Sequence, residues 1–439
     1  MRRYNWLTVF TVFVFFIFYS DSYSQEAKKL SLQDCIEIAL ENNTRIVSTQ
    51  SYSKMAEAGL RSAWGNFMPQ IDSYARWQKQ SKDQYNIRFD ELVISKESYY
   101  YQFSLSQPIF TGLRNYYTLK RNKADEKYYR NNLSWTKQLV VLEVKLNYYN
   151  VLKAIQLLKI AEETLKTSQE ELNRIEAMEK IGAGSRAEVY QQKVRVGENK
   201  LAVIEARNGL INAKTDLNYV LGIDITTSIE LITEATDMNV EIQKIDLDDA
   251  IEEAFQRRLD YRSFQNQFEK AKANVNVQRS SYYPNLSLSA NYSWWDVQFP
   301  KRKRDITEFD SYSFGLSLSM NLFNGFQTRA AVSSAKAEVV VAEADLEQAK
   351  RQVTLEVKKA VLELEKAAEK IQVTEENVTS AEEDFRLASE RYRIGAGTLL
   401  DQNTAQTSLT RARVNRIQAI YDYKYALEVL HLARGSLAW

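Results

Sequence analysis

The sequence predicts a mainly α-helical protein with a small β part, built from two fused copies of one half-protein. An Ile-Gly-Ala-Gly motif at 181–184 returns at 394–397, which is 213 residues later. Two stretches of helix-forming residues, 114–180 and 327–393, contain no proline. Segments that alternate polar and apolar residues precede each of these stretches, as strands do. We therefore expect long helices joined to pairs of strands, with this set of elements occurring twice.

The first residues have the three regions of a secretory signal peptide. Arg2 and Arg3 precede an almost entirely apolar run from Trp6 to Tyr19, and small and polar residues follow that run. The alternative is a membrane anchor helix, but a run of about 14 residues is shorter than the roughly 20 residues that cross a bilayer. We therefore expect residues 1–24 to be a signal peptide that directs export.

The internal repeat covers most of the remaining chain. Residues 32–39 (LQDCIEIA) resemble residues 247–254 (LDDAIEEA), at an offset of 215. A unit of this length is too long for a solenoid repeat, which has about 20 to 50 residues. We therefore divide the mature chain into a first structural repeat, 25–235, and a second structural repeat, 236–439.

Each repeat contains a pair of predicted strands that starts at a proline. The first pair lies between about 69 and 110, and the second lies between about 284 and 323. Strands of about ten residues have the length that a membrane-spanning strand needs. A soluble hairpin with one buried face is the alternative. Aromatic residues near the strand ends favour a membrane girdle, and these residues are Trp77, Tyr99, Trp294 and Trp295.

The long helices after the strands predict a supercoiled structure. At 1.5 Å per residue, each stretch could reach about 100 Å, which does not fit a compact domain. In the second stretch, apolar residues follow one another at alternating steps of four and three residues from Val353 to Tyr392. This 3.5-residue repeat predicts a left-handed supercoil with a partner helix. After each Ile-Gly-Ala-Gly motif we expect a return helix, capped by Ser185 or Thr398.

Four strands per chain are too few to close a barrel in a membrane, because open sheet edges leave backbone groups without hydrogen-bond partners in lipid. Bacterial barrels have at least about eight strands. Three copies of four strands would supply twelve. We therefore predict a homotrimer in which an α-helical barrel of long coiled-coil hairpins continues a 12-stranded transmembrane β-barrel.

The composition argues against catalysis and against nucleic-acid binding. Lys and Arg number 58 and Asp and Glu number 57, so the chain lacks the net positive charge that attracts nucleic acid. Cys35 and His431 are the single cysteine and the single histidine, so no Cys/His cluster exists for zinc. The Gly-Ala-Gly motif lacks the Lys-Ser/Thr of a phosphate-binding loop. We therefore expect no catalytic residues, no cofactor, no metal site and no enzymatic activity.

These features together resemble the TolC-type outer-membrane efflux proteins, and the resemblance covers about residues 26–439. The most specific motifs are Tyr-Arg-Ile-Gly at 392–395, Ile-Gly at 181–182, and Phe-x-Gly after each strand pair, at 110–112 and 323–325. The resemblance implies a homotrimer in the outer membrane of a Gram-negative cell, with a long periplasmic extension and contacts to outer-membrane lipid. It also implies a passive conduit that docks on a periplasmic adaptor, a membrane fusion protein, and works with an inner-membrane transporter.

The resemblance also assigns roles to residues at the two hairpin tips. It implies that Asp401, Glu188 and Tyr392 form a gate at the periplasmic entrance. For the two acids, the alternative is that a charge at a helix N-terminus complements the helix dipole. Two positions depart from the family pattern, since Thr404 replaces a second acid and Gly397 replaces an arginine. The residues that would dock on the adaptor are Ile181, Gly182, Ala183, Gly184, Ser185, Arg186, Ile394, Gly395, Ala396, Gly397, Thr398 and Leu399.

We predict that the protein is the outer-membrane exit duct of a tripartite efflux pump. The first alternative is the outer-membrane component of a type I protein secretion system, which the same family also supplies. The second alternative, of another class, is a secreted coiled-coil structural or adhesive protein without a pore. Four aromatic-flanked strands favour a duct over an adhesin, because an adhesin has no need of membrane-spanning strands.

Overall fold

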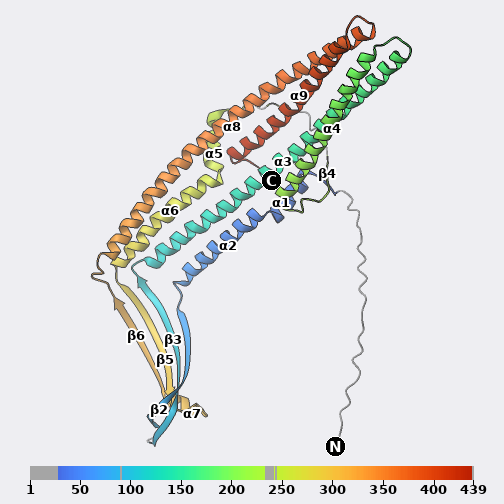
Figure 1. Ribbon diagram of the computed structural model, residues 1–439. Coiled ribbons are helices and arrows are strands. Elements are labelled where there is room, and N and C mark those ends of the chain that lie inside the picture. The colour runs from blue at the N-terminus through green and yellow to red at the C-terminus, as the bar shows by residue number, and fades with distance from the viewer. Residues whose placement is uncertain (1–27, 89–90, 233–241, 243–244, 438–439) are drawn as a thin grey trace, which may run out of the picture.

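The computed structural model describes the chain except residues 1–27, 89–90, 233–241, 243–244 and 438–439. The predicted signal peptide over 1–24 lies outside the described residues. The described chain is elongated, with a sheet at one end, two helical hairpin tips at the other end and long helices between them (Figure 1). None of the described helices combines the length and the low polarity that a bilayer-spanning helix needs.

Both predicted long helices extend over the whole expected stretch. Helix α3 spans Arg114–Lys180 and α8 spans Gln327–Arg393, with 67 residues each. Their return helices start directly after the predicted N-caps, Ser185 and Thr398, so the prediction of two long hairpins is confirmed. The other described helices are α1 (Leu32–Asn42), α2 (Thr44–Gly65), α4 (Arg186–Leu221), α5 (Leu247–Arg257), α6 (Leu259–Arg279), α7 (Lys303–Thr307), α9 (Leu399–Ala433) and a 3₁₀ turn at Ser280–Tyr282.

The helices lie side by side in one layer. Near the sheet the order is α2, α3, α6, α8, and nearer the tips it is α4, α3, α9, α8. Helices α3 and α8 therefore run through the whole layer, with α6 and α9 between them (Figure 1). Beside α1, the short strands β1 (Lys28–Leu30) and β4 (Ile229–Leu231) pair in parallel. The order of two short helices, two long strands and a helical hairpin occurs in both halves.

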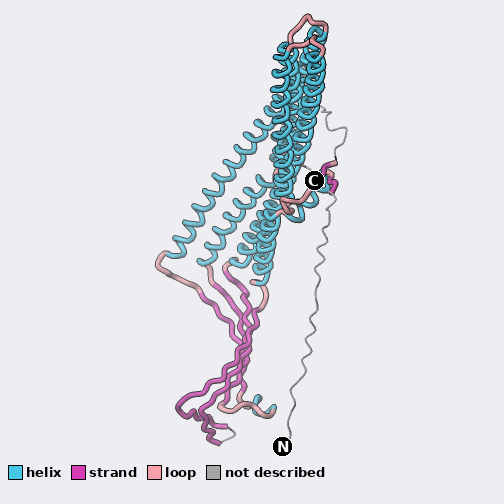
Figure 2. The backbone as a smooth tube through the Cα atoms, turned by 45° about the vertical axis from the view of Figure 1, so that its right-hand side comes forward, coloured by secondary structure: helices cyan, strands magenta, loops and turns pink. Residues whose placement is uncertain are grey.

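Among the described residues, four long strands form one antiparallel sheet in the order β2-β3-β5-β6, which twists strongly along its length (Figure 2). The second pair, β5 (Asn285–Asp296) and β6 (Asp310–Ser319), has 12 and 10 residues, as predicted. The first pair, β2 (Gln70–Arg88) and β3 (Glu91–Thr111), has 19 and 21 residues, so the prediction of about ten residues is wrong there. Near the turn between β2 and β3, apolar residues pair across the two strands, for example Ile87 with Leu92. These pairs extend the hydrogen-bonded sheet beyond the polar pairs in the middle of the hairpin, such as Lys79 with Glu97.

The sheet has one apolar face and one polar face. Leu105 of β3 pairs with Ala290 of β5, which pairs with Phe314 of β6, so these side chains share one face. The adjacent row, on the opposite face, is polar and consists of Ser104, Asn291 and Ser313. Phe314 is 77% exposed. The apolar face is therefore uncovered at β6 in the described structure.

Two buried clusters hold the helices together at the middle of the layer. The first joins residues of α1, α2, α3, α4, α9, β1 and β4 and contains Cys35, which is fully buried, as predicted. Burial, with a smaller contribution from the negative charge of the neighbouring Asp34, raises the pKa of the Cys35 thiol to about 12. The second cluster joins α5, α8 and α9 and contains the part of the predicted α8 seam from Val353 to Ala367. The supercoil partner of α8 within the chain is therefore α9.

The strands lead into the long helices through two left-handed residues in each half. Gly112 and Leu113 have φ of 61° and 67°, and Gly325 and Phe326 have φ of 64° and 67°. Left-handed backbone is unfavourable for a residue with a Cβ, whereas glycine adopts it readily. The glycine of each Phe-x-Gly motif thus allows the chain to turn from the sheet into the helical layer.

Candidate functional site at the hairpin tips

Both tips turn through the same backbone conformation. Gly182 has φ of 78° and Gly395 has φ of 76°, as the motif predicts. The second glycine of each motif has a different reason. A Cβ on Gly184 would lie 3.1 Å from the backbone nitrogen of Glu179, and Gly397 is equally crowded. A left-handed conformation therefore explains the first glycine of the motif, and close backbone approach explains the second.

The two predicted gate acids lie in capping boxes at the starts of α4 and α9. Glu188 accepts a hydrogen bond from the backbone N–H of Ser185 at 3.3 Å, and the Ser185 side chain caps α4 in return. Asp401 accepts hydrogen bonds from the backbone N–H and the hydroxyl of Thr398, at 3.1 and 2.7 Å. The Thr398 hydroxyl oxygen accepts from the Asp401 backbone N–H at 3.1 Å. Both acids therefore stabilise helix N-termini, which was the alternative to a gate role.

The capping geometry leaves Asp401 able to act on ions as well. Its side chain is exposed, and both of its hydrogen bonds to Thr398 use the same carboxylate oxygen, Oδ2. The hydrogen bonds from Thr398 hold the pKa of Asp401 below its usual range, and Arg391 lowers it further. The site is therefore negatively charged at neutral pH, with a second carboxylate oxygen available. Glu188 is half-buried, and the gate role of both acids stays a prediction.

Tyr392, the third predicted gate residue, joins the two hairpins. The guanidinium of Arg174 in α3 lies 5.0 Å from the centroid of the Tyr392 ring, within the range of a cation–π contact. Arg174 also forms an ion pair with Glu171 of its own helix. Burial raises the pKa of the Tyr392 hydroxyl, and Glu188 raises it further, so this residue is neutral at neutral pH. The ring packs against an apolar cluster of Leu172, Ile175, Val189, Val196 and Leu399.

A polar layer joins the hairpins a few turns from the tips. Gln192 of α4 donates a hydrogen bond to the Ser168 carbonyl at 3.0 Å, and Asn403 of α9 donates to Gln192 at 3.3 Å. Arg195 of α4 donates to the hydroxyl of Thr407 in α9. The hairpins are therefore connected near their tips by directional bonds in addition to apolar packing.

Most of the predicted docking residues are exposed. Ile181 and Ile394 are 80% and 72% exposed, so each tip presents a large apolar side chain to solvent. Leu399 differs, because it is 2% exposed and packs in the cluster that contains Tyr392. As the first residue of α9, Leu399 contributes to contacts between the hairpins, and its side chain is not available to a docked partner in this structure.

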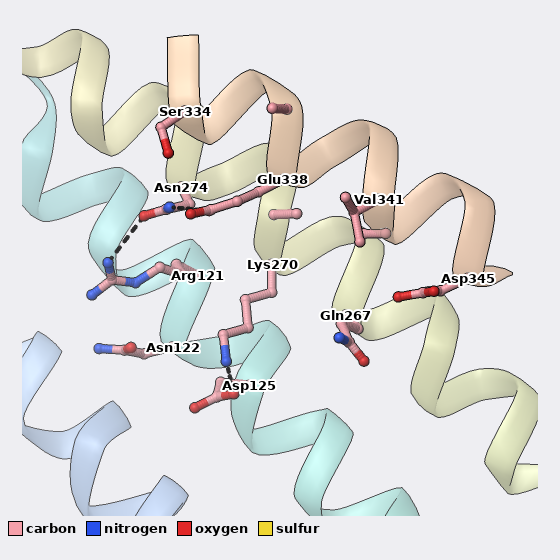
Figure 3. A pocket seen from close by; sticks show the side chains of 13 residues that line it. Arg121, Asn122, Asp125, Gln267, Lys270, Asn274, Ser334, Glu338, Val341 and Asp345 are labelled. Atoms are coloured by element: carbon pink, nitrogen blue, oxygen red, sulfur yellow. Dashed lines mark hydrogen bonds and ion pairs between the residues drawn. The ribbon is translucent and has the colours of Figure 1, made fainter. Parts of the chain in front are cut away.

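A second candidate site is a polar groove of about 720 Å³ between α3, α6 and α8, near the sheet. Figure 3 shows Lys270 of α6 paired with Asp125 of α3, at 2.6 Å. In the same view, Arg121 donates to Asn274 at 3.3 Å and Asn274 donates to Glu338 at 3.0 Å. Over the described part of the chain, no group of three or more His, Cys, Asp or Glu side chains could hold a metal ion. The groove offers paired charges and hydrogen bonds, and no motif in the sequence indicated it.

Arg174 and Glu171 were also not predicted from the sequence. They form one more acid–base pair at the i, i+3 spacing, and such pairs are common on solvated helices. The signal that distinguishes Arg174 is its position beside Ile175, which is 1% exposed. A charged residue at the edge of a buried seam can reach the neighbouring helix.

Comparisons with known proteins agree with this architecture. The family model described as "Outer membrane efflux protein" matches residues 35–223 and 250–436. Outer membrane protein TolC of Vibrio cholerae is 22% identical over 311 residues, which cover 70% of this chain and 68% of the relative. A probable efflux pump outer membrane protein of Pseudomonas putida, TtgC, is 26% identical over 35% of this chain and 31% of its own. The crystal structure of the Campylobacter jejuni CmeC outer membrane channel has a TM-score of 0.79 and 17% identity, and covers 92% of this chain and 85% of that chain.

Proposed function

Because the chain belongs to the outer membrane efflux protein family, we propose that it forms the outer-membrane exit duct of a tripartite efflux pump. The membership confirms the resemblance noted in the sequence, and the members of this family are outer membrane channel proteins, not enzymes. In this proposal the duct is passive, and an inner-membrane transporter supplies the energy.

The two-faced sheet is the observation that carries the proposal. An apolar face suits lipid and a polar face suits a water-filled lumen. In the described chain, β2 and β6 are the outer strands, and each pairs on one side only. Because an open edge is unfavourable in lipid, we propose that β6 of one copy pairs with β2 of the next. Three copies would then form a homotrimer with a 12-stranded transmembrane β-barrel.

We propose that the helical layers of the three copies form an α-helical barrel in the periplasm. With 67 residues each, α3 and α8 reach about 100 Å. The two segments matched by the family model support the division into repeats 25–235 and 236–439. The starts of these segments are 215 residues apart (250 − 35) and their ends 213 (436 − 223), the offsets seen in the repeated motifs. Such a repeat would make the ring nearly six-fold symmetric.

We propose that the exposed tips dock on a periplasmic adaptor. The docking surface would consist of residues 181–186 and 394–398, in which Ile181 and Ile394 supply exposed apolar side chains. Behind this surface, Asp401, Glu188 and Tyr392 would form the gate. The charge and exposure of Asp401 support its role at the entrance.

Efflux is favoured over type I protein secretion because a relative, TtgC, is named as part of an efflux pump. A wide lumen would provide no binding site that selects one cargo, so secretion remains the second candidate for the same duct. Membership in an outer membrane efflux family disfavours the alternative of a secreted structural or adhesive protein without a pore.

The experiment that tests the duct is single-channel recording of the detergent-purified protein in a planar bilayer, beside native mass spectrometry of the same sample. We expect a trimer and cation-selective channels, with weaker selectivity in Asp401→Ala. Channels that are indifferent to this substitution would support the duct and refute the role of Asp401. A monomeric protein without channels would refute the duct.

A further inference from the structure

A groove of about 590 Å³ lies between α2, α3 and α6, near the sheet. Its lining includes the apolar and aromatic side chains Leu60, Trp64 and Tyr116. It is also lined by Lys120, Lys123 and Lys127, which are exposed. We call it the lysine groove. A lining that combines apolar side chains with cations matches an amphipathic anion rather than a free inorganic ion.

The three lysines of the groove are not neutralised by carboxylates. All three side chains are exposed, and none forms an ion pair with an acid in the described part of the chain. Glu269 also lines the groove, but it pairs with Lys272 at 3.2 Å. The ammonium group of lysine is carried on a flexible four-carbon chain, so it can move towards a bound anion. The groove therefore has positive charge available for a bound anion.

The polar groove of Figure 3 provides the contrast. It is also lined by α3 and α6, but its cations Lys270 and Arg121 are engaged by Asp125 and Asn274. At 100° per residue, the α3 residues of the two grooves point in directions roughly 180° apart. The two grooves therefore lie on opposite faces of the helical layer, and the lysine groove differs from the polar groove in combining aromatic residues with cations that form no ion pairs in the described chain.

Exposed aromatic residues lie at the junction of sheet and helices in both halves, and two of them, Trp64 and Tyr116, line the lysine groove. Trp64 and Tyr116 are 56% and 55% exposed, and the ring centroids of Trp64 and Phe67 lie 6.1 Å apart. Phe323 and Phe326 occupy the same junction in the second half and are 74% and 65% exposed. Exposed Trp, Tyr and Phe in a belt are typical of a membrane–water interface. The lysines follow this belt along α3, on the side away from the sheet.

We propose that the lysine groove binds the phosphate headgroup of an anionic phospholipid in the periplasmic leaflet, with the lipid's apolar part on Leu60 and Trp64. This inference rests on the proposed membrane insertion of the sheet. From the start of α3 at Arg114, Lys120 lies about 9 Å and Lys127 about 20 Å along the helix. The headgroup layer is about 5–8 Å thick on each side of the hydrocarbon core. Lys120 therefore reaches the phosphates most easily and Lys127 least.

The test uses the full-length trimer in detergent, titrated with dioctanoyl-phosphatidylglycerol or dioctanoyl-phosphatidylcholine and followed by native mass spectrometry. One lysine near an anionic surface contributes about a factor of five in affinity. For Lys120→Gln/Lys123→Gln/Lys127→Gln we expect at least a tenfold weaker binding of phosphatidylglycerol and unchanged binding of phosphatidylcholine. Among the single variants, Lys120→Gln should lose the most and Lys127→Gln the least.

The matched control replaces three exposed lysines of the α3–α4 hairpin by Gln: Lys159, Lys166 and Lys200. This variant should bind phosphatidylglycerol as the wild type does. Equal binding by the wild type and the groove variant, both trimeric and conducting, would overturn the lipid site and leave the duct intact. Displacement of the lipid by millimolar inorganic phosphate would identify a simple anion site and overturn the proposal. If the groove variant lost the trimer while the control variant kept it, a second copy of the chain would cover the groove. This result would also overturn the lipid proposal. A wild type that forms neither trimers nor channels would overturn the duct and this inference together.

Discussion

Replacing Arg174 by Gln should open the tips, because this substitution removes a contact between the two hairpins. The guanidinium of Arg174 in α3 lies over the ring of Tyr392 in α8, 5.0 Å from its centroid. Gln has a similar reach and can still donate a hydrogen bond to Glu171, but it has no charge to interact with the ring. The apolar cluster around Tyr392 remains in place, so the helices should still pack.

The size of the effect follows from the exposure of the contact and from the proposed symmetry. A cation–π contact at a partly exposed site contributes about 0.5–1 kcal/mol, and the Arg174 side chain is 37% exposed. If the tips of a trimer open together, three such contacts are lost, which is about 1.5–3 kcal/mol. This free energy shifts the equilibrium between closed and open tips by roughly 10- to 150-fold.

The assay is the fraction of time that single channels are open in a planar bilayer. The control is Arg386→Gln, because Arg386 forms the same i, i+3 ion pair with Glu383 on α8 and has no ring contact with the other hairpin in the described structure. We expect Arg174→Gln channels to be open far more often, and Arg386→Gln channels to behave as wild type. Equal open times in all three proteins would refute the contact as a constraint on the gate.

The remaining predictions concern a charge, a buried ion pair and a thiol. Asp401→Asn keeps an acceptor for the cap but removes the charge, so reversal potentials should show weaker cation selectivity while circular dichroism gives an unchanged melting temperature. Because hydrogen bonds lower the pKa of Asp401, wild-type selectivity should persist as the pH falls through the usual Asp value near 3.9 and disappear only below it. Arg258 is 2% exposed and pairs with two carboxylates. Because the carboxylates of Asp260 and Glu356 remain partly exposed to solvent, Arg258→Met should lower the free energy of unfolding by about 2–3 kcal/mol in chemical denaturation. An unchanged free energy of unfolding would contradict the pairing. Cys35, with a pKa of about 12, should resist iodoacetamide at pH 8 in the native protein and react after denaturation, as mass spectrometry would detect.

The helices and their ends could be predicted from the sequence because local signals determine them. Proline is absent from α3 and α8, and the 3.5-residue repeat from Val353 identifies the packed side of α8. The capping residues Ser185 and Thr398 are side chains whose preference for helix starts is intrinsic. Glycine marks the turns, since it alone adopts positive φ without strain. Each of these signals acts within one or two helical turns and needs no tertiary information.

The features that the sequence did not predict depend on contacts between distant segments. The first strand pair is twice the expected length because cross-strand pairs continue the ladder, and pairing is not visible in one strand alone. Arg174 acquires a role only when Tyr392, more than 200 residues later, is placed beside it. The lysine groove needs Leu60 of α2 beside Lys120 of α3. Burial of Leu399 likewise follows from the meeting of two hairpins.

The distribution of packing along the hairpins indicates where the duct can move. At the middle of the layer, the cluster around Cys35 also includes Tyr421 of α9, so both halves share one core there. Lys145 of α3 and Glu428 of α9 add an ion pair at 2.9 Å, with side chains only 15% and 12% exposed. The tips share a smaller cluster, one ring–cation contact and a few hydrogen bonds.

Local opening occurs where few buried contacts must be broken. The hairpins should therefore separate at the tips and pivot about the middle of the layer. The proposed gate would then open without disturbing the sheet, which lies at the opposite end of the long helices (Figure 1). Hydrogen exchange should be fast in the first turns of α4 and α9 and slow around Tyr421, and the opposite order would contradict this pivot.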